Sequence, residues 1–163
     1  MGFFEKYLSF LPWFKQRLDI KSKGAYPADM LSNFAEHHFE MDVVFCASME
    51  GFLQSLKFQD IARQKQICSY VGSKAKEAGM AQDWRKTQTL YWQGEAYDRH
   101  GQAYQGLLQA AYSKLVTVPS FRKALKDSAG MTLVHSIGVQ NPRETIFTEE
   151  EFCGLLTKFR KTI

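Results

Sequence analysis

The clearest pattern of hydrophobic and polar positions runs from Ser48 to Asp60. Its apolar residues recur every three or four positions, as on the buried face of an amphipathic helix. Four of them share one arc of roughly 100°: Met49, Phe52, Leu53 and Leu56. Ser48 stands where an N-cap hydroxyl would accept a hydrogen bond from the first turn. The sequence therefore predicts a helix over 48–60.

Polar residues on the neighbouring arc of this helix are Glu50, Gln54 and Lys57. With a rise of about 1.5 Å per residue, Glu50 and Lys57 would lie roughly 10 Å apart along the axis. That separation is too long for a simple ion pair between adjacent turns, and it is close to the length of a small bound molecule. A solvated polar face and a wall of a binding site are both compatible with the pattern.

Other segments complete the predicted fold. An alternation with a period of two predicts a strand over 39–46, and 131–137 reads as a short buried strand between glycines. Helical spacing or caps predict further helices at 60–70, 73–79, 100–115, from Pro119, and after a capping box formed by Thr148 and Glu151. The expected fold class is α+β, predominantly α-helical, with a small β-sheet. Aromatic residues at helical spacing predict an N-terminal helical extension over 1–23, followed by a single domain over 24–163.

Charge and cysteine content narrow the classes of partner. The net charge is +4, from 21 basic and 17 acidic residues spread along the chain. This balance favours an anionic small ligand and lacks the basic stripe typical of a nucleic-acid surface. The three cysteines have no Cys-x-x-Cys spacing, which indicates free thiols in a reducing cytosol. Without an apolar run of about 18 residues or a convincing signal peptide, we expect a cytoplasmic protein with no membrane partner.

Two motifs carry a family resemblance. Ser32-Asn33-Phe34 precedes the predicted strand, and Glu50, Gln54, Lys57 and Phe58 follow it with the spacing Glu-x-x-x-Gln-x-x-Lys-Phe. This order resembles the YbiA-like (NADAR) family, whose usual wording is Ser-Asn-Phe followed by Ser-Glu-His-Tyr-Phe-Gln-Ala-Gln-Lys-Phe. The resemblance extends from about residue 26 to the C-terminus.

The resemblance implies a YbiA-like single domain that hydrolyses N-glycosidic bonds of ribosylated bases. Riboflavin-pathway intermediates and ADP-ribosyl groups, including ADP-ribose attached to a nucleic acid, are the implied substrates. No metal and no organic cofactor are implied. The implied catalytic residues are Glu50 and Lys57, and the implied substrate-binding residues are Asn33, Phe34, Gln54, Trp84, Asn141 and Arg143.

The chain departs from the family pattern at two places. Family members usually carry an Arg directly after the glycine that this chain has at position 79, where Met80 stands instead. The loop over 136–144 lacks the acidic residue and the Trp-Gly pair that many members have before the last helix. Asn141 and Arg143 are therefore the candidates for contacts to the sugar, base or phosphate in this loop.

The chemistry of the bond explains the choice of residues. Cleavage builds positive charge on the ribose C1′ and negative charge on the departing base. Glu50 could stabilise the first charge or orient water, and Gln54 could orient a hydroxyl. Lys57 could bind a phosphate, or its desolvated amine could attack C1′ and form a Schiff base.

Two other functions fit the sequence. The first is a catalytically silent module that binds ADP-ribose or a nucleotide. The second is a cysteine enzyme that uses Cys46 or Cys68 with His135, although buried cysteines are more often structural. The adjacent His37 and His38 do not favour a metal site, since neighbouring side chains on a strand point to opposite faces. The sequence does not give the oligomeric state.

Overall fold

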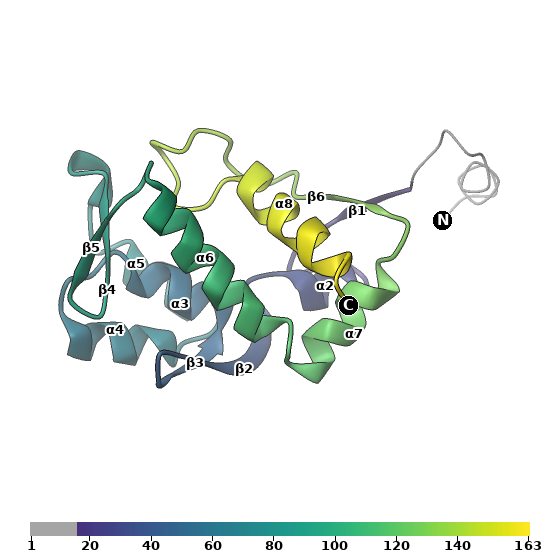
Figure 1. Cartoon of the computed structure of the whole chain (residues 1–163), viewed down its shortest axis with the longest axis horizontal. Coiled ribbons are helices and arrows are strands. Elements are labelled where there is room, and N and C mark those ends of the chain that lie inside the picture. The colour runs from purple at the N-terminus through teal and green to yellow at the C-terminus, as the bar shows by residue number, and fades with distance from the viewer. Residues whose placement is uncertain (1–15) are drawn as a thin grey trace.

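The computed structural model describes residues 16–163, which contain seven α-helices, one 3-10 helix and six short strands. The strands form three two-stranded sheets. Helices predominate, so the predicted α+β class is confirmed. The long helix α6 (Gln102–Leu115) crosses the molecule with α8 (Glu149–Arg160) beside it. At the end opposite α7 (Pro119–Asp127) lies the hairpin of β4 (Thr89–Trp92) and β5 (Glu95–Asp98) (Figure 1).

The central element is α3 (Met49–Ser55), in which every residue is buried. It packs between α4 (Ile61–Cys68), α5 (Gly72–Gly79) and β3 (Val44–Ser48). The hydroxyl of Ser48 accepts from Gly51 N at 3.0 Å and donates to Tyr70 O at 2.8 Å. A Cβ on Gly51 would lie 2.7 Å from that same Tyr70 oxygen, so only glycine permits this close packing of α3 against the end of α4.

The predicted helix over 48–60 has the predicted N-cap but ends earlier. After α3 the backbone N–H groups donate to carbonyl oxygens three residues earlier instead of four. The distances are 3.2 Å for Leu56, 3.3 Å for Lys57 and 3.0 Å for Phe58. These tight turns reverse the chain, and Asp60 then caps α4 by accepting from Ala62 N. Lys57 therefore lies in the turn after α3, beyond the last helical residue.

The single strand predicted over 39–46 is a hairpin of β2 (Glu36–Met41) and β3, which is a correction. Its two-residue turn is Asp42-Val43, and both residues have positive φ, 48° and 60°. The turn changes which positions face the core: Phe39 and Met41 are buried, whereas Val43 is 92% exposed. A β-branched residue rarely adopts this conformation, and for that reason the sequence did not indicate a turn here.

The remaining predicted helices are confirmed within two residues at their starts, and the capping box of Thr148 and Glu151 is present in α8. The predicted buried strand over 131–137 is the shorter β6 (Thr132–Val134), which pairs in parallel with β1 (Arg17–Asp19). The sequence did not indicate β1, the short helix α2 (Ala28–Leu31) or the hairpin of β4 and β5. The domain boundary between residues 23 and 24 stays a prediction, and most of the aromatic extension lies outside the described residues.

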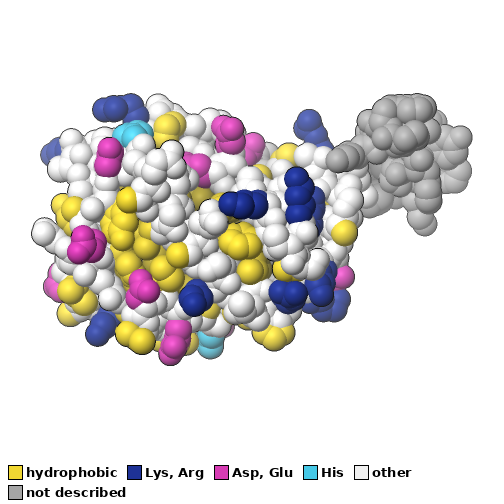
Figure 2. All heavy atoms as spheres, viewed as in Figure 1, with side chains coloured by type: hydrophobic (Ala, Val, Ile, Leu, Met, Phe, Trp, Pro, Cys, Tyr) yellow, Lys and Arg dark blue, Asp and Glu magenta, His cyan; other side chains and the backbone are white. Residues whose placement is uncertain are grey.

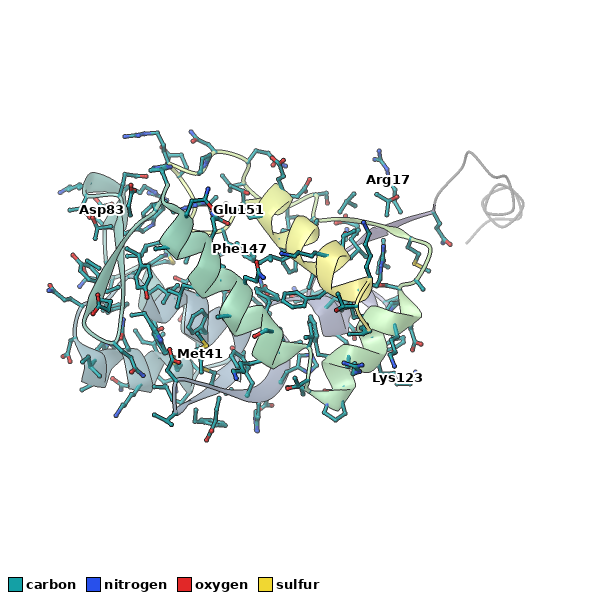
Figure 3. The ribbon with its side chains drawn as sticks, in the orientation of Figure 1. Arg17, Met41, Asp83, Lys123, Phe147 and Glu151 are labelled. Atoms are coloured by element: carbon teal, nitrogen blue, oxygen red, sulfur yellow. The ribbon has the colours of Figure 1, made fainter. Side chains whose placement is uncertain are left out.

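The core lies between α3, α6, α8 and the hairpins. Tyr104 and Tyr112 of α6 are fully buried, and each hydroxyl donates to an oxygen of a distant segment. Arg99 is also buried and holds the chain before α8 in place: its Nε donates to Thr145 O at 2.9 Å, and its Nη2 lies 2.6 Å from Glu151 Oε1. Figure 3 shows Glu151 at the start of α8, beside α6.

No helix within residues 16–163 combines the length and the apolar character that crossing a lipid bilayer requires.

Candidate functional site

One cavity of about 400 Å³ opens beside α3. Its walls come from the segment around Asn33, from α3 and the following turn, from α5, from the 3-10 helix η1 (Trp84–Lys86), and from the chain between β6 and α8. The residues that line it include Lys21, Asn33, Phe34, Glu50, Gln54, Lys57, Lys76, Trp84, Arg85, His135, Gly138, Glu144 and Phe152. Six of the eight residues predicted for the site therefore line a single space.

Glu50 lies in the first turn of α3 and is only 9% exposed. Its backbone N–H donates to Asn33 O at 2.9 Å, and its Oε1 accepts from Gln54 Nε2 at 2.8 Å. Burial raises the pKa of Glu50 above the usual value of 4.5, although the Gln54 hydrogen bond and the charges of Lys76, Lys57 and His135 oppose this rise. A carboxyl held in this way keeps its proton to a higher pH than an exposed glutamate does, which suits it to proton transfer.

Lys57 reaches the same cavity from the turn after α3 and is half-buried. Burial lowers the pKa of its amine below the usual value of 10.5; the Glu50 charge opposes this effect, and the charges of Arg85 and Lys76 add to it. Within the described part of the chain, Lys57 forms no ion pair. The site thus contains an amine whose neutral form is favoured relative to an exposed lysine.

Gln54 holds the Glu50 carboxyl and is itself tightly confined. Its Oε1 is buried and has no hydrogen-bond partner within residues 16–163. That oxygen lies against Gly79, the last residue of α5: a Cβ built there would be 1.7 Å from it. Gln54 is 8% exposed and lines the cavity, but its Oε1 is buried against Gly79 and not open to the cavity.

Asn33 is held by hydrogen bonds from two helices. Its backbone oxygen accepts from Glu50 N of α3, as described above. The Tyr112 hydroxyl, from the buried face of α6, donates to Asn33 Oδ1. The amide oxygen is thus occupied, and the Asn33 NH₂ group remains as a donor on the cavity wall. The neighbouring Phe34 is half-buried and also lines the cavity, with its N–H donating to Ser32 Oγ at 3.2 Å.

The opposite wall carries Trp84 and Arg85 of η1. Trp84 is 6% exposed, so most of its ring belongs to the core and only an edge is open to the cavity. Arg85 is exposed, and its Nε lies 3.5 Å from Glu144 Oε2. Together with Lys21, Lys57 and Lys76 it places four cations on the cavity walls, against the two carboxylates of Glu50 and Glu144.

The structure does not bring Asn141 and Arg143 into this cavity. Both are exposed, and neither belongs to its lining. Asn141 Oδ1 accepts from Arg143 N at 3.0 Å, which closes a local turn, while Arg143 O accepts from Gln88 Nε2. The loop contributes through its flanks instead, with Gly138 on one side and Glu144 on the other.

Sequence reasoning missed three cavity residues that have a clear chemical character: Lys21, Glu144 and His135, the last considered only as a partner for cysteine. Lys21 and His135 come from chain segments that β1 and β6 bring together, and the sequence did not indicate that pairing. The thiols of Cys46 and Cys68 interact with each other in the core, and neither lines the cavity. The cysteine-enzyme arrangement is therefore not assembled.

The adjacent histidines point to different environments, as expected on a strand. His37 is buried between Ser120 Oγ and Met30 O, at 2.8 Å from each. His38 is exposed, 3.0 Å from Glu36 Oε1. Over residues 16–163, no three His, Cys, Asp or Glu side chains gather as a metal site would require.

Comparisons with known proteins first define the fold. The chain is similar to YbiA of E. coli, known from an NMR structure, with a TM-score of 0.60 and 15% identity over 91% of this chain and 84% of that one. The predicted YbiA-like fold is thus confirmed. The family is defined by sequence: residues 25–161 match the model of the bacteriophage protein GP30.3 family, to which this chain belongs. A relative from Enterobacteria phage T4, a 17.1 kDa protein in the Gp30-rIII intergenic region, is 34% identical over 149 residues, covering 90% of this chain and 98% of the relative.

Proposed function

We propose that this protein hydrolyses the bond between ribose C1′ and a base nitrogen in a phosphate-bearing ribosylated base. The observation that carries the proposal is that a buried carboxyl, Glu50, and a half-buried amine, Lys57, line the same cavity. The likeness to YbiA supports the fold on which such a site is built. No metal and no organic cofactor enters the proposed reaction.

Lys57 is proposed as the nucleophile because its surroundings favour the neutral amine. Its Nζ forms a bond to C1′ while the bond from C1′ to the base nitrogen breaks, and the bonding pair leaves with the base. The sugar ring then opens to a Schiff base on Lys57. Water adds to this Schiff base, which releases the sugar and restores the amine.

Glu50 is proposed as the group that accepts the proton lost by Lys57 after attack, and later as the base that activates water. Its raised pKa favours exchange of a proton at a higher pH than an exposed glutamate allows. Gln54 keeps the carboxyl in place through the hydrogen bond at 2.8 Å. The Asn33 amide, fixed by Tyr112, is proposed to donate to a ribose hydroxyl.

The other basic side chains on the cavity walls are proposed to bind the phosphate part of the substrate. With Lys57 used as the nucleophile, Lys76 and Arg85 remain on the cavity walls to bind a phosphate or pyrophosphate. They are proposed to take the place of the Arg that family members usually carry where this chain has Met80. Phe34 and Trp84 are proposed to contact the ribose or base. An ADP-ribosylated base, free or within a nucleic acid, and a phosphorylated riboflavin-pathway intermediate both satisfy this description. Basic and acidic side chains are interspersed on the face shown in Figure 2, so the nucleotide itself, rather than a basic stripe, is proposed as the recognised group.

The test is a panel of ribosylated and ADP-ribosylated substrates incubated with the protein and analysed by mass spectrometry. We expect release of a free base and a sugar phosphate or ADP-ribose by the native chain. Glu50→Gln should abolish this release, while Glu40→Gln, at an exposed position of β2, should retain it. Tight binding of ADP-ribose without turnover of any substrate would contradict the proposal and support a silent binding module.

A further inference from the structure

His135 follows β6 on the cavity wall and is held from several sides. Its Nδ1 lies 2.6 Å from Ile20 O, and its backbone N–H donates to Glu149 Oε2 at 3.1 Å. Its ring meets the Phe152 ring edge to face, with centroids 5.4 Å apart and planes at 82°. A Cβ on Gly138 would lie 2.8 Å from His135 Cδ2, so glycine leaves room for the ring.

These contacts fix the tautomer of the ring. A carbonyl oxygen can only accept, so Nδ1 must carry a hydrogen when it bonds to Ile20 O. Nε2 has no hydrogen-bond partner within residues 16–163, and the side chain is half-buried on the cavity wall. The neutral ring therefore offers Nε2 as an acceptor, and the protonated ring offers an acidic hydrogen there.

The charged groups nearest to His135 are already engaged by other partners, so none of them binds its Nε2. Charged groups around His135 are Asp19 and Lys21 next to β1, Glu149 on α8, and Glu50 on α3. Asp19 is already paired with Lys21 and with Ser136, and Glu149 binds the backbone N–H of His135. A positive charge on His135 is the smallest of the effects that oppose the rise that burial produces in the Glu50 pKa, so the two groups lie within electrostatic range of each other.

Resting on the N-glycosidase function proposed above, we propose that His135 is a catalytic residue: the general acid that protonates the departing base. As the bond from C1′ to the base nitrogen breaks, the bonding pair moves to that nitrogen, and the hydrogen on His135 Nε2 is transferred to it. Nδ1 keeps its hydrogen bond to Ile20 O throughout. The ring then recovers a proton from water, so it is unchanged over the cycle.

His135→Asn gives a test that separates acid catalysis from structure. The asparagine NH₂ can take the place of Nδ1 and keep the bond to Ile20 O, while nothing replaces Nε2. His38→Asn, at an exposed position of β2, is the matched control. Both variants are compared with the native chain on substrates whose departing bases differ in basicity, with circular dichroism and thermal unfolding as checks on the fold.

We expect His135→Asn to lower kcat/KM by about 10²- to 10⁴-fold for the most basic departing groups. The loss should be much smaller for electron-poor bases, which leave without protonation, so the dependence of rate on base pKa becomes steeper. His38→Asn should match the native chain.

Three results would overturn the assignment. An unchanged rate and slope in His135→Asn, with Glu50→Gln inactive, would reject His135 and leave the N-glycosidase function standing. An equal loss on every substrate with an unchanged slope would show that His135 only supports the structure. Absence of turnover by the native chain on the whole panel would reject both proposals together.

Discussion

Gln54 donates a hydrogen bond of 2.8 Å from Nε2 to Oε1 of Glu50, one turn earlier on α3. Both side chains are more than nine-tenths buried, so this bond determines where the Glu50 carboxyl points. The other end of the Gln54 amide lies against Gly79 of α5. The carboxyl is therefore positioned by the contact between two helices as well as by its own helix.

Gly79→Ala should displace Gln54, because the added Cβ would lie 1.7 Å from Gln54 Oε1 and 3.1 Å from its Cβ. Overpacking of this kind typically costs 1–3 kcal/mol, and we expect a loss of about 2 kcal/mol in the free energy of unfolding. Loss of the hydrogen bond would also raise the pKa of Glu50 further, which shifts the pH dependence of turnover to higher pH. Urea denaturation and pH–rate profiles measure the two effects.

The matched control is Gly106→Ala, within α6, where a Cβ meets no atom within 4 Å. Alanine is the better helix former, so this variant should gain about 1 kcal/mol of stability and keep its pH profile. Equal behaviour of the two variants would show that the contact between Gln54 and Gly79 has no bearing on the site.

Glu50→Gln should stabilise the folded protein while it removes activity. Burial raises the folded-state pKa of Glu50, so ionisation at neutral pH costs folding free energy. Glutamine can keep the hydrogen bond from Gln54 without a charge, and we expect a gain of about 1 kcal/mol. The gain should be absent below the usual glutamate pKa of 4.5, grow as pH rises above that value, and level off once the folded carboxyl is ionised.

Urea denaturation of both proteins over a series of pH values measures this difference. Glu40→Gln serves as the control, because Glu40 is exposed on β2 and its neutralisation should change stability by less than about 0.5 kcal/mol. A gain that did not vary with pH would contradict the account of Glu50 as a buried, ionising group.

Lys57→Arg tests whether the amine attacks the sugar. Arginine retains the positive charge but remains protonated and cannot form a Schiff base, so turnover should be lost. In the native chain, cyanoborohydride should trap the sugar on Lys57, and tryptic peptides analysed by mass spectrometry would identify the adduct. Burial lowers the pKa of the Lys57 amine below the usual lysine value of 10.5. Adduct formation should therefore rise with pH over a range that lies below 10.5.

Lys76→Arg is the control for this experiment, because Lys76 is proposed to contact phosphate as a cation. It should still form the adduct on Lys57. Full activity of Lys57→Arg would instead assign Lys57 to phosphate binding and require water as the direct nucleophile.

Much of the site could be predicted from the sequence because it is local. Glu50, Gln54 and Lys57 are within eight residues, and helical spacing alone places the first two on one face. Asn33 was accessible through the separate short motif Ser32-Asn33-Phe34. These predictions required no knowledge of long-range contacts, so the early end of α3 changed the position of Lys57 without removing it from the cavity.

The missed features depend on distant pairing. His135 and Lys21 reach the cavity because β1 pairs with β6 across more than a hundred residues, and two three-residue strands leave almost no periodic signal. The hairpin turn at Asp42-Val43 was hidden because valine seldom adopts positive φ. Arg143 was assigned by chemistry and loop position, and only the structure shows that it lies outside the cavity.

Arg99→Met should be strongly destabilising, because it leaves the Glu151 carboxylate and Thr145 O without their buried partner. Breaking such a pair costs about 3 kcal/mol or more. Burial alone would raise the pKa of Glu151, but hydrogen bonds from Arg99, Gln105 and Thr148 N outweigh it and hold the pKa below 4.5. Stability from this group is therefore present above pH 4.5 and lost as pH falls through the folded-state pKa, and the variant should lose less on acidification.

Lys123→Met provides the contrast, since Lys123 pairs with Asp127 on the surface of α7 and its side chain is 71% exposed. Water screens such a surface pair, so the unfolding midpoint of this variant in urea should differ little from that of the native chain. Because Thr145 lines the cavity, Arg99→Met should also weaken substrate binding, whereas Lys123→Met should not. Equal stability of the two variants would mean that the Arg99–Glu151 pair does not fix the chain that closes the cavity before α8.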